Sequence, residues 1–140
     1  DYSHTPDGLE NIINAVRDFT KGKVITVFGC GGDRDKTKRP IMGRIAGELS
    51  YYCIITSDNP RTENPSDIVD EVEVGVKETD CDYKKIVDRR DAIFYSVKLA
   101  GKDDTIIIAG KGHETYQIFS DETIHFDDVE VAKEALEDCN

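Results

Sequence analysis

Short apolar runs alternate along the chain with longer segments in which apolar residues recur every three or four positions. Residues 24–28, 51–56, 83–87 and 105–109 are rich in β-branched and other apolar or aromatic side chains, and they predict strands. The run at 24–28 is apolar on both faces, which is typical of a parallel strand buried between two layers. The segments between these runs carry the helical period and predict helices.

Five helices are expected around these strands. The first is expected to begin at Asp7, while Pro40, Ser66 and Asp88 suit the first turn or the N-cap of the next three. The last is expected to begin at about Asp128. Apolar residues recur in these helices: Leu9, Ile12, Ile13, Val16 and Phe19 with helical period; Ile41, Ile45 and Leu49, which are expected to point inward; Ile68, Val69, Val72 and Val76 on one side; Ile93, Val97 and Leu99; and Val131, Ala132, Ala135 and Leu136, which are available for packing.

The C-terminal part of the chain shows a different pattern. Residues 116–119 and 124–126 flank a polar segment and predict an antiparallel hairpin. Elsewhere strands alternate with helices, which implies right-handed crossovers and a mostly parallel sheet with helices on both faces. We therefore expect an α/β fold, a Rossmann-like three-layer sandwich with a mostly parallel sheet and this hairpin, in one domain spanning residues 1–140.

Composition and charge narrow the possible partners. Hydrophobic residues make up 38% of the 140 residues, and no apolar run approaches the roughly 20 residues that span a bilayer. The formal net charge of −11 disfavours binding to nucleic acid, which requires a basic surface. The start of the chain lacks the pattern of a signal peptide, and the four cysteines have no metal-ligand spacing. We expect a cytoplasmic protein with reduced thiols, no membrane partner and no metal site of its own.

Three polar loops follow the expected strands, at residues 29–39, 57–61 and 110–114. Ligands of open α/β sheets bind outside the carboxyl ends of the strands, so these loops are expected to converge on one edge. The first loop contains four cations within six residues, Arg34, Lys36, Lys38 and Arg39. A dense cationic cluster in an acidic chain favours a local site for an anionic group.

The first loop fits neither common nucleotide motif. A dinucleotide fingerprint would need a glycine where Arg34 stands, and a Walker A loop would need a glycine in place of Asp35. What remains are two cations: Arg34 can bind a carboxylate through two hydrogen bonds, and Lys36 is a mobile charge suited to phosphate. The alternative is that the glycines only turn the chain and the cations are solvated.

The other two loops carry groups of both charges. Arg61 can receive a carboxylate, Asp58 an ammonium group, and Asn59 can donate or accept a hydrogen bond. A plain turn would explain the first three residues of Asp58-Asn59-Pro60-Arg61 but not the arginine. In the third loop, Gly110 allows close approach of the backbone, and Glu114 can bind a second ammonium group. Together with Arg34, these residues suit a ligand with two carboxylates and two ammonium groups.

At this point four segments, residues 1–7, 29–39, 58–61 and 110–114, jointly resemble the C-terminal domain of the Mur ligases. The resemblance covers essentially the whole chain. It implies an ATP-dependent, ADP-forming amide ligase of peptidoglycan synthesis, in which an acyl phosphate is attacked by the amine of the incoming amino acid. It assigns amino-acid binding to Arg34, Asp58, Asn59, Arg61, Gly110 and Glu114. It places Asp1, Tyr2 and His4 near the nucleotide and Lys36 near the phosphates.

Arg61 resembles the branch of the family that adds meso-diaminopimelate to the UDP-muramoyl dipeptide, whereas lysine-adding relatives generally have a small residue there. In the family, the ATP-binding P-loop and most Mg²⁺ ligands belong to a central domain, and the UDP-sugar site belongs to an N-terminal domain. The resemblance implies that residues 1–140 contain neither, so the isolated domain is expected to fold but not to catalyse. Thr37 stands where the family's loop generally has a glycine.

Other functions would explain some of the same sequence features. An amino-acid-binding or regulatory module without a catalytic role would have the same fold and the same zwitterion site. A lysine-adding ligase of the same family would differ mainly at Arg61. A dinucleotide-dependent oxidoreductase is disfavoured by the glycine spacing.

Overall fold

The computed structural model describes residues 4–139, and its centre is a parallel sheet of four strands. The strands are β1 (Val24–Phe28), β2 (Tyr52–Ile55), β3 (Asp82–Lys85) and β4 (Thr105–Ile108), in the order β3-β2-β1-β4. All three pairings are parallel. The predicted α/β class is confirmed, and the strand order brings the ends of β1, β2 and β4 next to one another.

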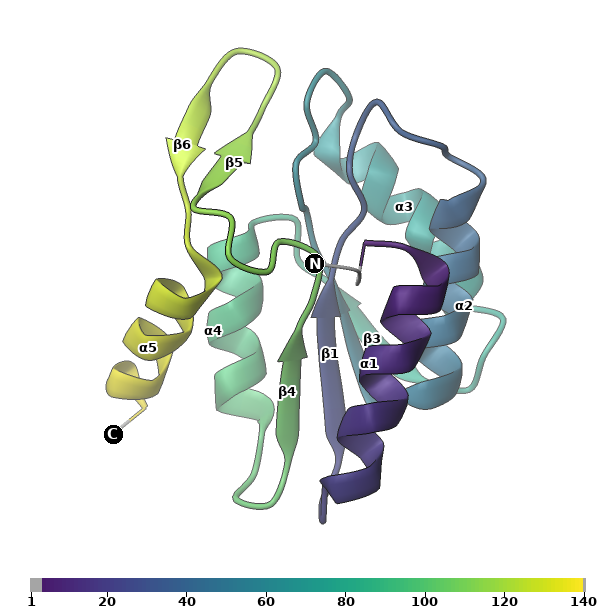
Figure 1. The fold of residues 1–140 in the computed structure, drawn as a ribbon, viewed down its shortest axis with the longest axis vertical. Coiled ribbons are helices and arrows are strands. Elements are labelled where there is room, and N and C mark those ends of the chain that lie inside the picture. The colour runs from purple at the N-terminus through teal and green to yellow at the C-terminus, as the bar shows by residue number, and fades with distance from the viewer. Residues whose placement is uncertain (1–3, 140) are drawn as a thin grey trace.

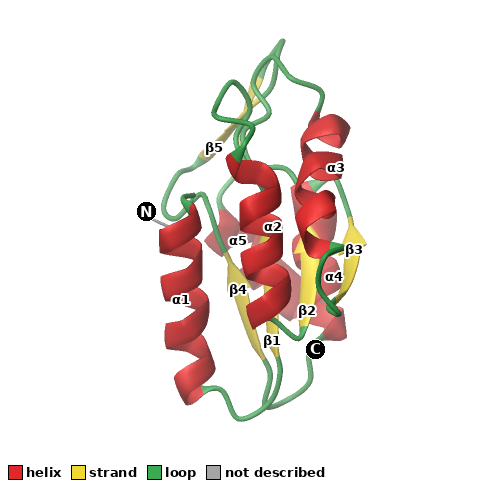
Figure 2. Cartoon of the chain, turned by 90° about the vertical axis from the view of Figure 1, so that its right-hand side faces the viewer, coloured by secondary structure: helices red, strands yellow, loops and turns green. Residues whose placement is uncertain are grey.

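Helices cover both faces of this sheet (Figures 1 and 2). The helices α1 (Pro6–Phe19), α2 (Lys38–Leu49) and α3 (Pro65–Val76) lie on one face, and α4 (Arg89–Leu99) and α5 (Asp128–Asp138) on the other. The strand β1 supplies both cores, because its alternate residues point to opposite faces. Val24 and Phe28 pack with α1, α2 and α3, whereas Ile25 and Val27 pack with α4 and α5.

The expected hairpin is present as a separate antiparallel sheet of β5 (Tyr116–Ile118) and β6 (Thr123–His125). It rises beyond the carboxyl ends of the parallel strands (Figure 1). The hairpin is tied to the loop after β2, since the backbone N–H of Arg61 donates to the carbonyl of Ile118 at 3.0 Å. It therefore forms one side of the region where the loops meet.

Two of the predicted helix starts were wrong in detail. The cap of α1 is Thr5, whose hydroxyl accepts from Gly8 N at 3.1 Å, and not Asp7. The cap of α3 is Asn64, whose side chain accepts from Ser66 N at 2.8 Å. In both helices a proline follows the capping residue at the first helical position, where its missing N–H costs nothing. The predicted cap of α4, Asp88, is confirmed by its bond from Asp91 N at 3.0 Å.

Several apolar residues of the helices lie at the surface. Ile41 of α2 is 50% exposed, Phe19 of α1 is 69% exposed and Leu136 of α5 is 55% exposed. Ile12 and Leu99 are also exposed. The buried face of α2 instead consists of Arg39, Met42, Gly43, Ala46 and Gly47. Small residues face inward there because α2 packs closely against α3, so the predicted inward position of Ile41 was wrong.

Candidate functional site

A cavity of about 510 Å³ lies at the carboxyl ends of the strands, where the three polar loops meet. All six residues expected to bind the amino acid line it, namely Arg34, Asp58, Asn59, Arg61, Gly110 and Glu114. His4 also lines the cavity, next to the start of α1. Asp1 and Tyr2 lie outside the described residues. Lys36 is not among the lining residues; its side chain is 64% exposed and its Nζ lies 3.6 Å from Glu63 Oε1.

The loop after β2 is a buried part of the site and not a surface turn. Asp58 is 7% exposed and Asn59 is 3% exposed. Gln117 of β5 donates to the carbonyl of Asp58 at 2.7 Å, and Asn59 Oδ1 accepts from the backbone N–H of Ile118 at 3.0 Å. The hairpin thus satisfies two polar groups that burial of this loop removes from water, the carbonyl of Asp58 and Oδ1 of Asn59. The position of β2 fixes where the loop begins, and the hydrogen bonds to the hairpin fix the conformation of the loop.

Arg61 occupies an unusual backbone conformation, with φ of 54°. Positive φ is uncommon for residues other than glycine, and such residues cluster at functional sites. The guanidinium donates from Nη1 to the carbonyl of Gly32 at 3.0 Å and lies against the cavity. Arg61 therefore joins the first loop to the second while presenting its charge to the cavity.

The glycines of the first loop allow the second loop to approach closely. The N–H of Gly32 donates to the carbonyl of Asn59 at 2.7 Å. A Cβ at position 32 would lie 1.7 Å from Pro60 O, and one at Gly31 would lie 2.9 Å from Arg61 Nη1. Gly32 is required for this loop contact, because the obstructing atom is a backbone oxygen, whereas a side chain at position 31 would displace only the end of Arg61.

The four cations of the first loop separate into two kinds. Arg39 is buried and pairs with Glu63 at 2.7 Å and with Glu71 at 3.4 Å, and it also donates to the carbonyl of Gly31 at 3.0 Å. Hydrogen bonds from Arg39 and from the backbone of Asp33 lower the pKa of Glu63 to about 2. Sequence reasoning missed Glu63, which ties this loop to the segment before α3. No motif marks it, because its partners are distant in sequence.

Arg34, Lys38 and Arg39 all line the cavity, and of these Arg34 and Lys38 are exposed. Arg34 donates from Nη1 to the carbonyl of Asp33 at 3.0 Å, and within residues 4–139 neither of the two exposed cations forms an ion pair. Together with Arg61 they bring positive charge to the cavity. Asp58 and Glu114 bring negative charge to it.

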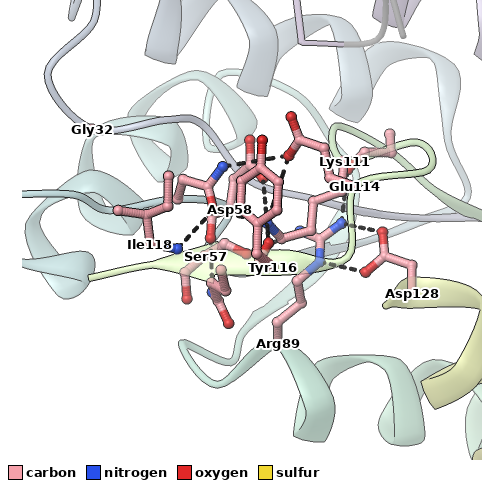
Figure 3. A network of polar contacts seen from close by, with 12 residues as sticks. Gly32, Ser57, Asp58, Arg89, Lys111, Glu114, Tyr116, Ile118 and Asp128 are labelled. Carbon is pink, nitrogen blue, oxygen red and sulfur yellow. Dashed lines mark hydrogen bonds and ion pairs between the residues drawn. The ribbon is translucent and has the colours of Figure 1, made fainter. Parts of the chain in front are cut away.

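Two buried cations that sequence reasoning assigned no role hold the acidic side of the cavity (Figure 3). Lys111 donates from Nζ to Asn59 Oδ1 at 2.8 Å and to the carbonyl of Tyr116 at 2.6 Å. Arg89 of α4 binds both carboxylate oxygens of Asp128 at 2.8 Å. It also donates to the backbone carbonyls that precede Asp58 and Gly110, those of Ser57 and Ala109.

The charge on Asp58 depends on these cations. Burial raises the pKa of its carboxyl, while the charges of Arg89 and Lys111 act in the opposite direction. Its Oδ1 is buried and has no hydrogen-bond partner among the described residues. Burial lowers the pKa of Lys111, and the neighbouring Asp58 opposes that change. The two groups therefore stabilise each other's charged forms.

Cys30 lies in the wall of the cavity but is not activated. Burial raises the pKa of its thiol to about 12, and its Sγ lies 3.7 Å from Met42 Sδ. A reactive cysteine needs its thiolate form near neutral pH. Cys30 is therefore a packing residue of the site.

The described residues contain no group of three or more His, Cys, Asp and Glu side chains that could hold a metal ion. No helix in residues 4–139 is long and apolar enough to cross a membrane.

The cavity therefore combines cations and carboxylates on an α/β domain, and comparison with known proteins identifies the family. The model of the "Mur ligase, glutamate ligase domain" family matches residues 1–112. The chain belongs to the Mur ligase family. This confirms the resemblance that the loop sequences indicated.

The relatives of this Mur ligase domain carry a common name. The chain is 57% identical over 97% of its length to a UDP-N-acetylmuramoyl-L-alanyl-D-glutamate--2,6-diaminopimelate ligase of Caldanaerobacter subterraneus. It is 59% identical over 99% of its length to the protein of the same name from Clostridium tetani. A solved structure of a ligase of this name superposes with a TM-score of 0.93 at 40% identity, over 99% of the chain. The chain spans 28% of the length of each of these proteins.

Proposed function

We propose that this Mur ligase domain binds the incoming amino acid in a longer ligase, which adds meso-diaminopimelate to the UDP-muramoyl dipeptide in the cytoplasm. The observation that carries the proposal is that Arg34, Arg61, Asp58 and Glu114 line one and the same cavity. Meso-diaminopimelate has two carboxylates and two ammonium groups. The names of the relatives support the same substrate.

The charges of both signs that line the cavity orient such a ligand. Asp58 and Glu114 receive an ammonium group, and Arg61 and Arg34 receive a carboxylate through paired hydrogen bonds. Each charge-assisted hydrogen bond contributes about 1.5–3 kcal/mol. Lysine lacks one of the two carboxylates, so loss of a contact to an arginine lowers its affinity by about tenfold or more.

ATP and Mg²⁺ belong mainly to other parts of the ligase in this proposal. The described residues lack a cluster that would fit a complete magnesium site. His4 lines the cavity and Lys36 lies on the exposed side of the first loop, where each can approach a nucleotide bound by a preceding domain. The role of this chain is to hold the amino acid, and residues 1–140 alone are expected to show no ligation.

The test compares two amino acids in the full-length ligase supplied with ATP, Mg²⁺ and the UDP-muramoyl dipeptide. We expect ADP release that depends on meso-diaminopimelate. In Arg61→Ala, kcat/KM for meso-diaminopimelate should fall about 10- to 100-fold, as expected for one lost charge-assisted contact, while the low rate with L-lysine should change little. Arg90→Ala removes an exposed arginine whose partner is Glu134, away from the cavity, and it should leave both rates unchanged.

The comparison separates two roles of Arg61, because the side chain also donates to Gly32. If it only joined the two loops, its loss would reduce the rates with both amino acids by the same factor. Release driven by L-lysine in the unmodified ligase would refute the proposed substrate. No release with either amino acid would refute the ligase function.

A further inference from the structure

Lys111 is a fully buried cation placed among the polar groups of the cavity without lining it. Its side chain is 0% exposed, and its ammonium group lies between the second loop, the hairpin and its own loop. Two hydrogen bonds fix it, to Asn59 Oδ1 and to the carbonyl of Tyr116. A buried ammonium group is costly unless it is paired, so this position requires an electrostatic explanation.

The carboxylates near Lys111 exceed the cations available to them. Arg89 and Asp128 form a pair of their own through two bonds of 2.8 Å. Lys111 is then shared by Asp58 at 3.6 Å and Glu114 at 3.8 Å. One cation and two carboxylates leave one negative charge, which an ammonium group of a ligand can neutralise. Figure 3 shows these side chains converging.

We propose that Lys111 is a positioning residue for the bound amino acid, holding Asn59 and Glu114 in place and keeping Asp58 negatively charged to receive an ammonium group. The proposal rests on the proposed function. It adds a residue that contacts the side chains proposed to bind the amino acid but does not contact the amino acid itself. It also explains why the third loop carries a lysine between two glycines: Gly110 and Gly112 both have positive φ, at 113° and 57°, and they turn the chain so that Lys111 points inward.

The expected pH dependence follows from the groups that face Asp58. The groups with a charge or a titratable proton near it are Arg89, Lys111, Glu114 and Asp128, together with the thiol of Cys30. Of these, Lys111 and Arg89 favour its ionised form. Removing the charge of Lys111 raises the pKa of Asp58, so the carboxylate is lost at a higher pH. As the pH is lowered, binding of the amino acid should therefore weaken at a higher pH in the variant than in the unmodified ligase.

The experiment uses the full-length ligase with ¹³C-labelled aspartate side chains, and the resonance of Asp58 is assigned with Asp58→Asn. In Lys111→Met the pKa of Asp58 should rise by about 1 to 3 pH units, the usual effect of a neighbouring opposite charge. The acid limb of kcat/KM for meso-diaminopimelate should move upward by the same amount. KM for meso-diaminopimelate should rise about tenfold or more, while KM for ATP stays constant.

Lys85→Met is the matched control. Lys85 also pairs with two carboxylates, Asp70 and Glu73, each at 3.0 Å, but it lies at β3 away from the cavity. This variant should change neither the titration of Asp58 nor the pH profile. A Lys111→Met variant that alters only thermal stability, with the titration of Asp58 unchanged, would overturn the inference.

A second variant decides the matter if Lys111→Met does not fold. Glu114 is 38% exposed, so Glu114→Gln is tolerated sterically and leaves Lys111 with one carboxylate partner. The pKa of Asp58 should then fall, and an unchanged pKa would refute the shared-cation arrangement. If the unmodified ligase showed no activity with meso-diaminopimelate, the proposed function would fail, while the two titrations would still decide whether Lys111 keeps Asp58 charged.

Discussion

The chemistry of each cysteine follows from its surroundings and not from its position in the sequence. Cys30 and Cys53 are buried, and burial raises the pKa of the Cys30 thiol to about 12. Cys139 is exposed, at the end of α5. We therefore expect iodoacetamide at pH 8 to label Cys139 at least about tenfold faster than Cys30 or Cys53, since only exposed thiolates react.

Mass spectrometry of labelled peptides measures this difference. Unfolding in urea should make all four cysteines react at similar rates, which is the internal control. Fast labelling of Cys30 in the folded chain would show that the cavity activates its thiol and that burial does not suppress its reactivity.

At the scale of single residues, the sequence predicted which types of side chain line the cavity. It did not predict the buried charged residues that hold them in place. The loop composition was sufficient to select Arg34, Asp58, Asn59, Arg61 and Glu114, because their types and spacing match a zwitterion. It gave no sign that Arg39 and Lys111 are buried, since a charged residue is normally exposed. Their burial depends on acidic partners contributed by distant segments.

At the scale of elements, the contact between α2 and α3 depends on glycine. A Cβ on Gly75 would lie 1.8 Å from Pro40 O, and one on Gly43 would lie 2.1 Å from Val72 O. Both obstructing atoms are backbone atoms, which cannot move without shifting a helix. The two helices can therefore approach closely only because positions 43 and 75 carry no side chain.

Gly75→Ala tests this contact through two opposing effects. Alanine favours a helix by about 1 kcal/mol over glycine, whereas overpacking against a fixed backbone costs about 1–3 kcal/mol or more. We expect the clash to dominate and the free energy of unfolding to fall by about 1–3 kcal/mol. Urea unfolding measures the change.

Gly101→Ala is the matched control for this substitution. A Cβ at position 101 would lie 3.4 Å from Asp104 Oδ2, an ordinary contact. Its effect should stay within about 0.5 kcal/mol. Equal stability of the Gly75 and Gly101 variants would show that the two helices can separate without cost.

The sequence predicted the type and order of these elements well and their buried faces less well. Ile41 was expected inside because it is apolar and has helical spacing. In the structure the small residues of α2 face α3, and Ile41 is exposed. A periodic pattern indicates that a helix has a buried face, but the neighbouring helix decides which residues fit there.

At the scale of the whole molecule, Arg89 and Asp128 connect the helices α4 and α5 to the loops at the carboxyl ends of the strands. Arg89 begins α4 and Asp128 begins α5, and their buried pair also holds the carbonyls of Ser57 and Ala109. These carbonyls belong to the loops after β2 and β4. One buried guanidinium therefore joins the helical layer to the site.

Arg89→Met should lower the free energy of unfolding by about 3–5 kcal/mol, because it leaves Asp128 buried and unpaired. The double variant Arg89→Met/Asp128→Leu should recover part of this loss. The recovery should be incomplete, since the two carbonyls still lack their donor. Chemical denaturation of the three proteins measures both effects.

The neighbouring pair on the same two helices serves as the control. Arg90 and Glu134 lie 2.6 Å apart but are about half exposed, so Arg90→Met should cost no more than about 1 kcal/mol. Similar losses for the Arg89 and Arg90 variants would show that burial adds nothing to the pair.

The sequence by itself determined the α/β class, the order of the elements, the convergence of three polar loops and the charge types of the side chains that line the cavity. These features follow from local patterns, because apolar periodicity sets each element and parallel strands end at one edge. Only the tertiary structure decided which charged residues are buried and what they hold. Lys111 and Asn59 are 52 positions apart and Arg89 and Asp128 are 39 apart. Their pairing, and thus the charge of the site, arises only when the packed layers exclude water and bring distant side chains together.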